Sequence, residues 1–524
     1  MNRIVTDQLH EGGTLADMLI DALRRFPDRI AFEEEAGATV SYRDLGDLIG
    51  RGISVFRCLG LSHGNAVVQL SGNSPETFAL MAAAYMLGLR STTLNALGGV
   101  ADHRFIIDDA QAKLVVVDPA LGDRAADLSR DATVRFLAHG EGIAGVGDFW
   151  SLADGLAPAP LVVEAAASDV VRVAYTGGTT GRPKGVMLTH RSLVAQAIGT
   201  MIACRGVDNQ RFLCAAPISH AAGALVVPVL AAGGTVILQQ GFDPARFLRG
   251  VERHHATLTM LVPTMITALI DHPDRQRTDL RSLARILYGA APMAADRIRA
   301  AMSTFGPILV QSYGQSEAPS TVLLLDGDDH RHPDPTVLGS AGRPYPGVKV
   351  ALLDDDDRPV PHGGIGELCV RGALVMAGYQ GQPDQTAAAL RNGWLHTGDL
   401  ARQDAHGYYH LVDRKKDVIV TGGFNVYPAE VEAVIATCTG VAAVAVIGVP
   451  DDRWGEAVNA IVVPSPGAVP DVAAIRAAVR ASKGAVATPK EIELRGDLPL
   501  TSLGKIDKKA LRAPFWSGRD RSVN

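Results

Sequence analysis

The fold is decided by the stretch Tyr175-Thr176-Gly177-Gly178-Thr179-Thr180-Gly181-Arg182-Pro183-Lys184-Gly185. Apolar runs at 170–174 and 186–188 flank it, and each is typical of a β-strand. Glycines let the backbone turn tightly and bring its N–H groups close to an anion, because no Cβ intervenes. The threonine hydroxyls add hydrogen-bond donors, and Arg182 and Lys184 add positive charge. The stretch therefore predicts a phosphate-binding loop between two strands.

Two common nucleotide-binding loops do not fit this stretch. Lys184 lies between a proline and a glycine, whereas the lysine of a Walker A loop precedes Ser or Thr. No G-x-G-x-x-G opens a helix here, as a dinucleotide-binding fingerprint requires. A merely flexible surface loop is the remaining alternative, but solvated linkers seldom carry so ordered a pattern.

The stretch resembles the phosphate-binding loop of the adenylate-forming superfamily, which includes acyl- and aryl-CoA synthetases, luciferases and the adenylation domains of peptide synthetases. The chain is most similar to the AMP-forming fatty-acid or aryl-acid CoA ligases. Gly177 stands where the family usually has serine, so one hydroxyl donor is missing from the loop. Further motifs of the family follow in the expected order along nearly the whole chain.

The composition predicts a globular protein of more than one domain. A chain of 524 residues is too long for a single core, and 47% hydrophobic with 20% charged residues is an ordinary balance. The net charge of −6 provides neither a basic surface for nucleic acid nor a polybasic patch for membranes. No apolar run approaches the roughly 20 residues of a transmembrane helix, and the N-terminus does not read as a signal peptide. The scattered cysteines read as buried thiols, so we expect a reducing, cytoplasmic location.

The order of helical and strand-like patterns predicts an α/β protein with a large and a small domain. Alternating segments up to about residue 140 favour a largely parallel sheet. Short strands with glycine turns from about residue 338 predict a small β-rich subdomain. We therefore expect an N-terminal AMP-binding (adenylation) domain at 1–415, built from α/β subdomains and the β-rich one. A small mobile α+β domain should follow at 416–524.

The segment Tyr313-Gly314-Gln315-Ser316-Glu317 follows a strand-like run and resembles the family's Y-G-x-T-E element. By that resemblance Glu317 binds the Mg²⁺ that bridges phosphate oxygens, and a hard oxygen ligand suits this ion. Tyr313 would lie against the adenine, and Ser316 keeps the hydroxyl of the usual threonine. Taken alone, the pattern also fits an ordinary strand-to-loop turn.

The second strong match is Gly393-Trp394-Leu395-His396-Thr397-Gly398-Asp399-Leu400. A carboxylate can accept hydrogen bonds from two neighbouring hydroxyls, so Asp399 is the expected ribose ligand, although an Asp beside glycine also forms turns. The resemblance adds Arg414 as a second contact to the ribose hydroxyls. Glu367 and Gly378-Tyr379 fit an intervening motif, and we expect them to be mainly structural.

The resemblance also implies roles in the C-terminal part. Lys416 would be the hinge about which the small domain rotates, and Gly422, Gly423 and Phe424 would line the tunnel for the pantetheine arm of CoA. Lys505 matches the lysine of the family's P-x-T-x-x-G-K motif, which reaches the substrate carboxylate and the α-phosphate. Its charge would stabilise the negative charge that develops during adenylation, an effect typically worth roughly 10²–10³ in rate. A lysine on a glycine turn is otherwise usually just exposed.

Most of these implied assignments concern one nucleotide site. The residues expected to bind ATP and AMP are Thr176, Gly177, Gly178, Thr179, Thr180, Gly181, Lys184, Gly289, Ala290, Ala291, Tyr313, Gly314, Ser316, Asp399 and Arg414. Catalytic roles would fall to Lys505, His220 and Glu317, with Glu317 as the metal ligand.

The acid pocket is expected around segment 216–224. His220 matches an aromatic or histidine residue near the substrate carboxylate, although a lone histidine is more often structural. Ala221 stands where amino-acid-activating members have an aspartate, so we do not expect an α-amino acid. Small apolar side chains would leave the pocket wide and offer no partner to a charged group on the acid. They therefore predict a fairly bulky apolar acid, which could be fatty, branched or arylpropenoic. The expected pocket residues are Ala221, Ala222, Gly223, Val262 and Thr264, with Gly289, Ala290 and Ala291 beside them.

The resemblance implies an ATP- and Mg²⁺-dependent acid–CoA ligase, in which acid and ATP form an acyl-adenylate and CoA then displaces AMP. Its partners would be a small carboxylic acid, ATP and CoA, without nucleic acid, and a homodimer is compatible with the sequence. Three alternatives stay open: an acyl-AMP ligase that delivers to a carrier protein, a non-catalytic nucleotide-binding protein, and luciferase chemistry. We expect the aspartates at 354–357 to form a solvated turn. His254, His255, His330 and His332 read as surface or loop histidines, not a zinc site.

Overall fold

The computed structural model describes residues 12–96, 98–130, 132–176, 183–500 and 506–517. The chain forms two compact units. The larger unit comprises residues 1–349 and 370–395, and the smaller unit comprises residues 350–369 and 396–524. The boundary expected between residues 415 and 416 concerns two bodies that move against each other, and it stays a prediction.

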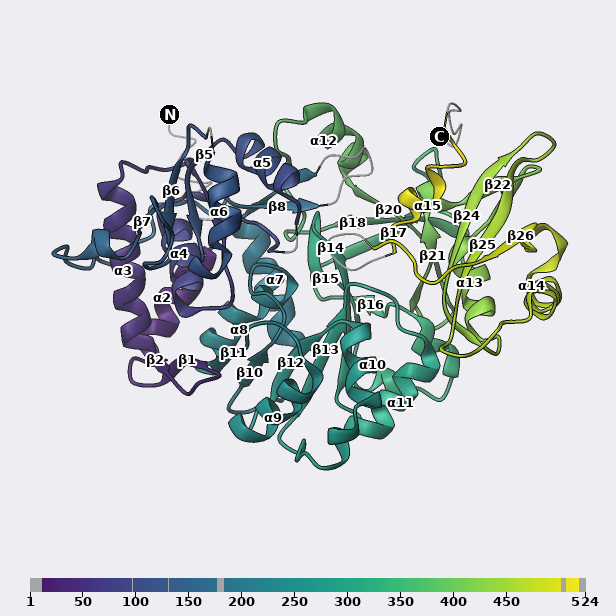
Figure 1. Ribbon diagram of the computed structural model, residues 1–524, viewed down its shortest axis with the longest axis horizontal. Helices are drawn as coiled ribbons and strands as arrows, with labels where there is room; N and C mark the ends of the chain where they lie inside the picture. The colour runs from purple at the N-terminus through teal and green to yellow at the C-terminus, as the bar shows by residue number, and fades with distance from the viewer. Residues whose placement is uncertain (1–11, 97, 131, 177–182, 501–505, 518–524) are drawn as a thin grey trace. The chain divides into compact units, whose positions relative to one another are not determined.

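In the described part of the larger unit, one sheet runs in the order β16-β15-β14-β13-β12-β10-β11-β1-β2 (Figure 1). The successive pairs from β1 through β11, β10, β12 and β13 to β14 are parallel, whereas β2, β15 and β16 pair antiparallel. Strand β11 is buried along its whole length, which explains its continuous apolar sequence. The strands are β1 (Ile30–Glu34), β2 (Thr39–Ser41), β10 (Arg211–Cys214), β11 (Thr235–Leu238), β12 (Leu258–Leu261), β13 (Arg285–Gly289), β14 (Leu309–Gln315), β15 (Ala318–Leu325) and β16 (Arg343–Pro344).

Helices α9 (Pro244–His254), α10 (Pro263–Asp271) and α11 (Ala295–Phe305) pack against this sheet (Figure 1). Their apolar stripes supply Phe247, Ile266 and Ile298 to a core that also contains Ile237 and Tyr288 from the strands. Burial of these side chains is the main stabilising contribution here. The packing leaves the carboxyl ends of the parallel strands to carry loops, where ligands bind in open α/β sheets.

A second sheet of the larger unit runs in the order β19-β9-β8-β4-β3-β5-β6-β7 within the described residues. Its strands are β3 (Ala66–Leu70), β4 (Arg90–Thr93), β5 (Ala112–Val117), β6 (Arg135–Ala138), β7 (Gly147–Asp148), β8 (Val170–Thr176), β9 (Lys184–Thr189) and β19 (Gly378–Tyr379). Helices α5 (Val100–Asp109) and α6 (Gly122–Ser129) share a core with β3 and β5. Helix α4 (Pro75–Met86) is buried at every position except Glu76. It contacts α3 (Tyr42–Cys58) and α2 (Leu15–Arg25), and α2 in turn contacts α7 (His190–Ala203) and α8 (Val226–Ala231).

The smaller unit contains two sheets in the part that the structure describes. The first, in the order β17-β18-β20-β21, consists of β17 (Lys349–Leu353), β18 (Ile365–Arg371), β20 (Leu395–Gln403) and β21 (Tyr409–Arg414). The second, in the order β23-β22-β25-β24 with β26 beside β25, consists of β22 (Ile419–Thr421), β23 (Phe424–Val426), β24 (Val441–Asp451), β25 (Gly455–Pro464) and β26 (Glu491–Leu494). Helices α13 (Pro428–Ala436) and α14 (Val472–Ala487) pack on this sheet, and α15 (Lys508–Arg512) adds Leu511 to a separate cluster with Ala445, Ile447 and Ile461.

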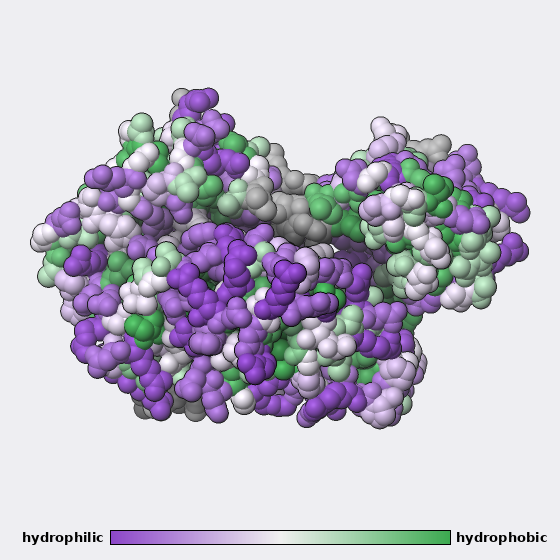
Figure 2. Space-filling view, turned by 60° about the horizontal axis from the view of Figure 1, so that its bottom comes forward, coloured by the Kyte–Doolittle hydropathy of each residue, from purple (hydrophilic) through white to green (hydrophobic). Residues whose placement is uncertain are grey.

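Hydrophilic side chains predominate on the face of the larger unit shown in Figure 2, with apolar ones scattered between them. Scattered exposed apolar residues are normal on globular proteins. Among the described residues, no helix combines the length and the apolar character that crossing a membrane would require.

Two expectations from the sequence were wrong. His254 and His330 are buried, with 4% and 3% of their surfaces exposed, because each has a polar partner inside the fold. His254 Nδ1 lies 2.8 Å from an oxygen of Glu33, and His330 Nε2 lies 2.9 Å from the Tyr288 hydroxyl. Cys58, expected to be buried, is exposed.

Candidate active site

The ends of the predicted phosphate loop are two antiparallel strands. β8 ends at Thr176 and β9 begins at Lys184, and these residues lie directly opposite each other. After the loop, a Cβ at Gly185 would come to 2.9 Å from Val173, so this position requires glycine. The loop residues expected to bind phosphate, Gly177, Gly178, Thr179, Thr180 and Gly181, lie outside the described residues.

A tyrosine links the start of β9 to the predicted metal ligand. Tyr379 lies on β19, which pairs with β9, and Lys184 Nζ is 5.1 Å from the centre of its ring, a cation–π arrangement. The Tyr379 hydroxyl donates a hydrogen bond of 2.8 Å to Glu317 Oε1. Burial and the negative charge of Glu317 raise the pKa of Tyr379, so the hydroxyl keeps its proton and remains a donor.

This role of Tyr379 was not anticipated, since we expected Gly378-Tyr379 to be mainly structural. The pair forms a two-residue strand, too short a pattern to indicate a partner. The sequence signal was the place of Tyr379 in the intervening motif, but its contact with Glu317 depends on the pairing of β19 with β9.

Glu317 lies in the tight turn between β14 and β15, where Gln315 pairs with Ala318. Its backbone carbonyl accepts a hydrogen bond of 2.8 Å from Met376 N, so the turn is held from outside the hairpin. A Cβ at Gly314 would lie 2.4 Å from Ser320 N, which requires glycine before the turn. The other residues expected here, Tyr313 and Ser316, are half-buried on the same hairpin.

The segment Gly289-Ala290-Ala291 follows the carboxyl end of β13, next to β14. Gly289 lies opposite Ser312, and a Cβ on it would come to 2.3 Å from Ser312 O. Ala290 has a φ of +65°, which a residue with a Cβ seldom adopts. Ala290 and Ala291 are both exposed, so this short turn presents its backbone beside Tyr313 at the end of the neighbouring strand.

An asparagine fixes the segment expected to form the floor of the acid pocket. Asn73 Oδ1 accepts a hydrogen bond of 2.8 Å from Ile218 N, and Asn73 Nδ2 donates one of 3.1 Å to Ala216 O. A Cβ on Gly223 would lie 1.8 Å from Ile218 O, so no other residue fits there. The sequence did not point to Asn73, because its partners follow about 140 residues later.

His220 lies in this segment with its ring against Ser219. His220 Nδ1 is 2.7 Å from Ser219 Oγ, and Arg172 donates a hydrogen bond of 2.8 Å to Ser219 O. Burial and the positive charge of Arg172 lower the pKa of His220 to about 4. The ring is therefore neutral at pH 7 and can offer a hydrogen bond but no charge.

The other residues expected to line the acid pocket follow strands of the same unit. Ala222 is buried, Gly223 is half-buried and Ala221 is exposed, all in a short 3₁₀ segment after His220. Val262 is the N-cap residue of α10, and Thr264 is exposed in its first turn.

The two predicted ribose residues lie together in the smaller unit. Asp399 on β20 and Arg414 on β21 are directly opposite, and Arg414 Nε is 2.7 Å from Asp399 Oδ1. The Asp399 side chain is 9% exposed, whereas that of Arg414 is 46% exposed. A buried carboxylate requires such a partner, because desolvation of an unpaired charge is costly.

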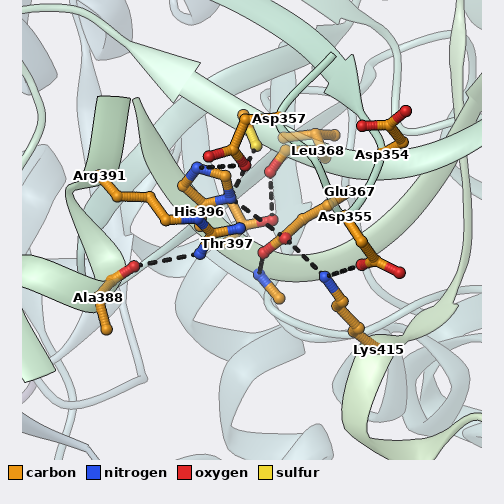
Figure 3. A network of polar contacts seen from close by, with 12 residues as sticks. Asp354, Asp355, Asp357, Glu367, Leu368, Ala388, Arg391, His396, Thr397 and Lys415 are labelled. Atoms are coloured by element: carbon orange, nitrogen blue, oxygen red, sulfur yellow. Dashed lines mark hydrogen bonds and ion pairs between the residues drawn. The ribbon is translucent and has the colours of Figure 1, made fainter. Parts of the chain in front are cut away.

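A network of polar contacts joins Glu367, His396 and Lys415 (Figure 3). Glu367, Cys369 and His396 are buried and offer ligand atoms of the kinds that zinc takes, all within 4.8 Å of one another. The Lys415 ammonium, however, lies 3.3 Å from Glu367 Oε2 and supplies the positive charge that this carboxylate needs. We therefore interpret the cluster as an ion-pair network.

The loop expected to line the CoA tunnel is a two-residue hairpin turn between β22 and β23. Gly422 and Gly423 have φ values of +58° and +81°, as this class of turn demands. A Cβ on Gly422 would lie 2.5 Å from the Trp454 ring, and Phe424 after the turn is 62% exposed. Lys416 is exposed in the short 3₁₀ segment Lys415–Asp417 that follows β21, and Lys505 lies outside the described residues.

Comparison with known families assigns the chain. The description "AMP-binding enzyme" matches residues 19–380, and "AMP-binding enzyme C-terminal domain" matches residues 430–505. The chain belongs to the AMP-binding enzyme family.

Relatives and solved structures of AMP-binding enzymes agree with this assignment. The chain is 42% identical to the medium/long-chain-fatty-acid–CoA ligase FadD8 of Mycobacterium tuberculosis, over 97% of this chain and 91% of the relative. It is 38% identical to a feruloyl-CoA synthase of Amycolatopsis sp, over 91% and 94%. The amide bond synthetase McbA from Marinactinospora thermotolerans superposes with a TM-score of 0.88 and 33% identity, covering 96% of this chain and 100% of that one.

These matches bear on the expectations from the sequence. The predicted adenylate-forming superfamily, the α/β fold with a small C-terminal domain, and the enzyme class are confirmed.

Proposed function

We propose that the chain is an AMP-forming ligase that joins a fairly bulky apolar carboxylic acid to CoA through an acyl-adenylate. The acid's carboxylate oxygen attacks the α-phosphorus of ATP, a new P–O bond forms, and pyrophosphate leaves. The CoA sulfur then attacks the acyl carbonyl, a C–S bond forms, and AMP leaves. The observation that carries this proposal is the bridge from Lys184 through Tyr379 to Glu317, which ties the phosphate loop to a carboxylate.

Glu317 has the chemistry of a Mg²⁺ ligand. Its carboxylate supplies hard oxygen atoms, and Mg²⁺ is commonly bound by one or two carboxylates together with substrate phosphates. A hydrogen bond from the neutral Tyr379 orients the side chain without cancelling its charge. When bound, the ion would withdraw negative charge from the phosphate oxygens.

The remaining catalytic groups follow the family resemblance. Asp399 and Arg414 would bind the ribose hydroxyls, with their ion pair fixing both side chains. Lys505 would stabilise the charge that develops at the carboxylate and α-phosphate. The domain from residue 416 onward would rotate about Lys416 between the two half-reactions and bring the Gly422-Gly423 turn to CoA.

The acid is inferred from the floor segment and from the relatives. A neutral His220 and the alanines after it offer no charge to a second polar group on the acid. FadD8 is a ligase for medium- and long-chain fatty acids, and the Amycolatopsis enzyme is a feruloyl-CoA synthase, whose acid is ferulic acid. Both kinds of acid are largely apolar. We infer a fatty or arylpropenoic acid for this chain.

Mass spectrometry of products from ATP, Mg²⁺, CoA and a panel of fatty, branched and aromatic acids tests this proposal. We expect AMP, pyrophosphate and the CoA thioester of one class of acid. Adenylate and pyrophosphate without a thioester would instead indicate another acceptor, such as the carrier protein considered above. Rapid turnover of acetate with failure of every bulky acid would refute the inferred substrate class.

A further inference from the structure

The carboxylate of Glu367 connects two strands of the smaller unit at one point (Figure 3). Glu367 lies on β18 and is 5% exposed. Its Oε1 accepts a hydrogen bond of 3.0 Å from Gly398 N on β20. Its Oε2 accepts one of 3.3 Å from Lys415 Nζ, at the end of β21.

These contacts fall beside the two residues that we assign to the ribose. Gly398 directly precedes Asp399, and Lys415 directly follows Arg414. Gly398 has a φ of +71°, so the chain enters Asp399 through a conformation that favours glycine. The buried Glu367 carboxylate therefore holds the backbone directly before Asp399 and the side chain of Lys415 directly after Arg414.

Neighbouring groups keep Glu367 charged and oriented. His396 Nδ1 lies 3.2 Å from Glu367 Oε2, and Lys415 also contacts Asp355 Oδ1 at 2.7 Å. Burial alone would raise the pKa of Glu367, but the contacts with His396, Lys415 and Gly398 outweigh it and lower that pKa. Two hydrogen bonds of Thr397 support the same turn. Thr397 Oγ1 donates to Leu368 O at 2.6 Å and accepts from Asp399 N at 3.1 Å.

We propose that Glu367 is a positioning residue for nucleotide recognition, which sets the geometry of the Asp399–Arg414 pair against the ribose hydroxyls. The inference rests on the proposed function, because it requires that this pair binds ribose. The inference goes beyond that function because it gives a role in nucleotide recognition to a buried charge that contacts Gly398, Lys415 and His396.

Isothermal titration calorimetry with AMP, 2′-deoxy-AMP and 3′-deoxy-AMP tests this role without any acid or CoA. The wild type should bind AMP about tenfold more tightly than the less favourable deoxy analogue, as expected for a lost hydrogen bond to a charged group. In Glu367→Gln the Gly398 contact can persist, but an amide NH₂ then faces the donors Lys415 and His396. We expect this variant to bind AMP about tenfold more weakly and to discriminate against the analogue by only about twofold.

Glu456→Gln is the matched control. Glu456 is 4% exposed in the other sheet of this unit and likewise accepts a backbone hydrogen bond, 3.2 Å from Val420 N. It should leave the ratio of AMP to deoxy-AMP affinity unchanged. If Glu367 had a purely structural role, Glu367→Gln would weaken the binding of all three ligands equally and keep the wild-type ratio, and that result would overturn the proposal. An equal loss of discrimination in Glu456→Gln would overturn it as well.

Lys415→Gln carries the test if Glu367→Gln does not fold, because the Lys415 side chain is 33% exposed. We expect it to reduce the ratio about threefold, and an unchanged ratio would overturn the proposal. If the wild type bound no AMP, the proposed function itself would be refuted. If the wild type bound AMP but the variants kept its affinity ratio, only the role of Glu367 would be refuted.

Discussion

In the larger unit Glu317 accepts a hydrogen bond from a neutral phenol, whereas in the smaller unit Asp399 faces a guanidinium at 2.7 Å. A neutral donor orients a carboxylate but leaves its charge in place, while a cation offsets that charge. The difference matches the ligands that we propose. A metal ion needs the charge of Glu317, but ribose hydroxyls need only an acceptor at a fixed position. The predictions below test this contrast between charge kept for a ligand and charge paired within the protein.

The largest effect is expected at Lys505, whose charge should serve only the reacting groups. Lys505→Ala should reduce adenylate formation by roughly 10²–10³-fold or more, yet spare thioester formation from a supplied acyl-adenylate. Pyrophosphate release and thioester formation are measured separately. Lys509→Ala, at an exposed position nearby, is the control. Equal loss in both half-reactions would contradict the proposed role.

Glu317→Gln should reduce adenylate formation by roughly 10²-fold, because it removes the charge proposed to hold Mg²⁺ while keeping the shape of the side chain. The Mg²⁺ concentration for half-maximal rate should rise, which a magnesium titration of pyrophosphate release measures. Glu35→Gln, at a surface ion pair of the same unit, should change neither quantity. An unaltered magnesium dependence in Glu317→Gln would break the contrast drawn above.

Tyr379→Phe should have a smaller effect, since the ring over Lys184 remains and only the hydroxyl that orients Glu317 is lost. We expect the KM for Mg²⁺–ATP to rise about tenfold, which corresponds to the loss of one hydrogen bond to a charged group. Steady-state kinetics at varied Mg²⁺–ATP measures this. A loss as large as that of Glu317→Gln would show that Tyr379 does more than orient it.

The smallest effect concerns Asp413, which precedes Arg414. Burial raises the pKa of Asp413 to about 6, above its ordinary value, so its contribution to stability is lost as pH rises through 6. Asp413→Asn stays neutral and keeps an oxygen for the hydrogen bond from Ala429 N, but its NH₂ group replaces the oxygen that accepts from Arg414 N at 2.7 Å, which offsets part of the gain. It should raise the Tm by about 2 °C at pH 7.5 and by less at pH 5. Scanning calorimetry at both values checks this, and a gain that is the same at both would contradict it.

The sequence predicted the elements whose signals are local. The strands on both sides of the phosphate loop, expected from the apolar runs at 170–174 and 186–188, are present. Asp399 and Arg414 were expected at one ribose, and the structure brings them together as a cross-strand pair. Their motifs carry the information in a few adjacent residues.

What the sequence could not supply depends on contacts between distant segments. Asn73 holds Ile218, and Tyr379 reaches Glu317, through pairings that no local pattern encodes. His254, at the end of helix α9, looked like a surface residue because its partner, Glu33, lies on strand β1 more than two hundred residues earlier. In each case the polar partner comes from a distant part of the chain that the fold brings close.

Gly223 limits how the segment proposed to bind the acid could be redesigned. Its missing side chain would lie 1.8 Å from Ile218 O, so a mutant library that varies this position would consist mostly of misfolded members. Diversity aimed at a different acid belongs at exposed Ala221 and Thr264, where a larger side chain meets solvent first. The segment thus contains one position that requires glycine and exposed neighbours that can be varied, so a directed-evolution library that keeps Gly223 would contain far fewer non-folding variants.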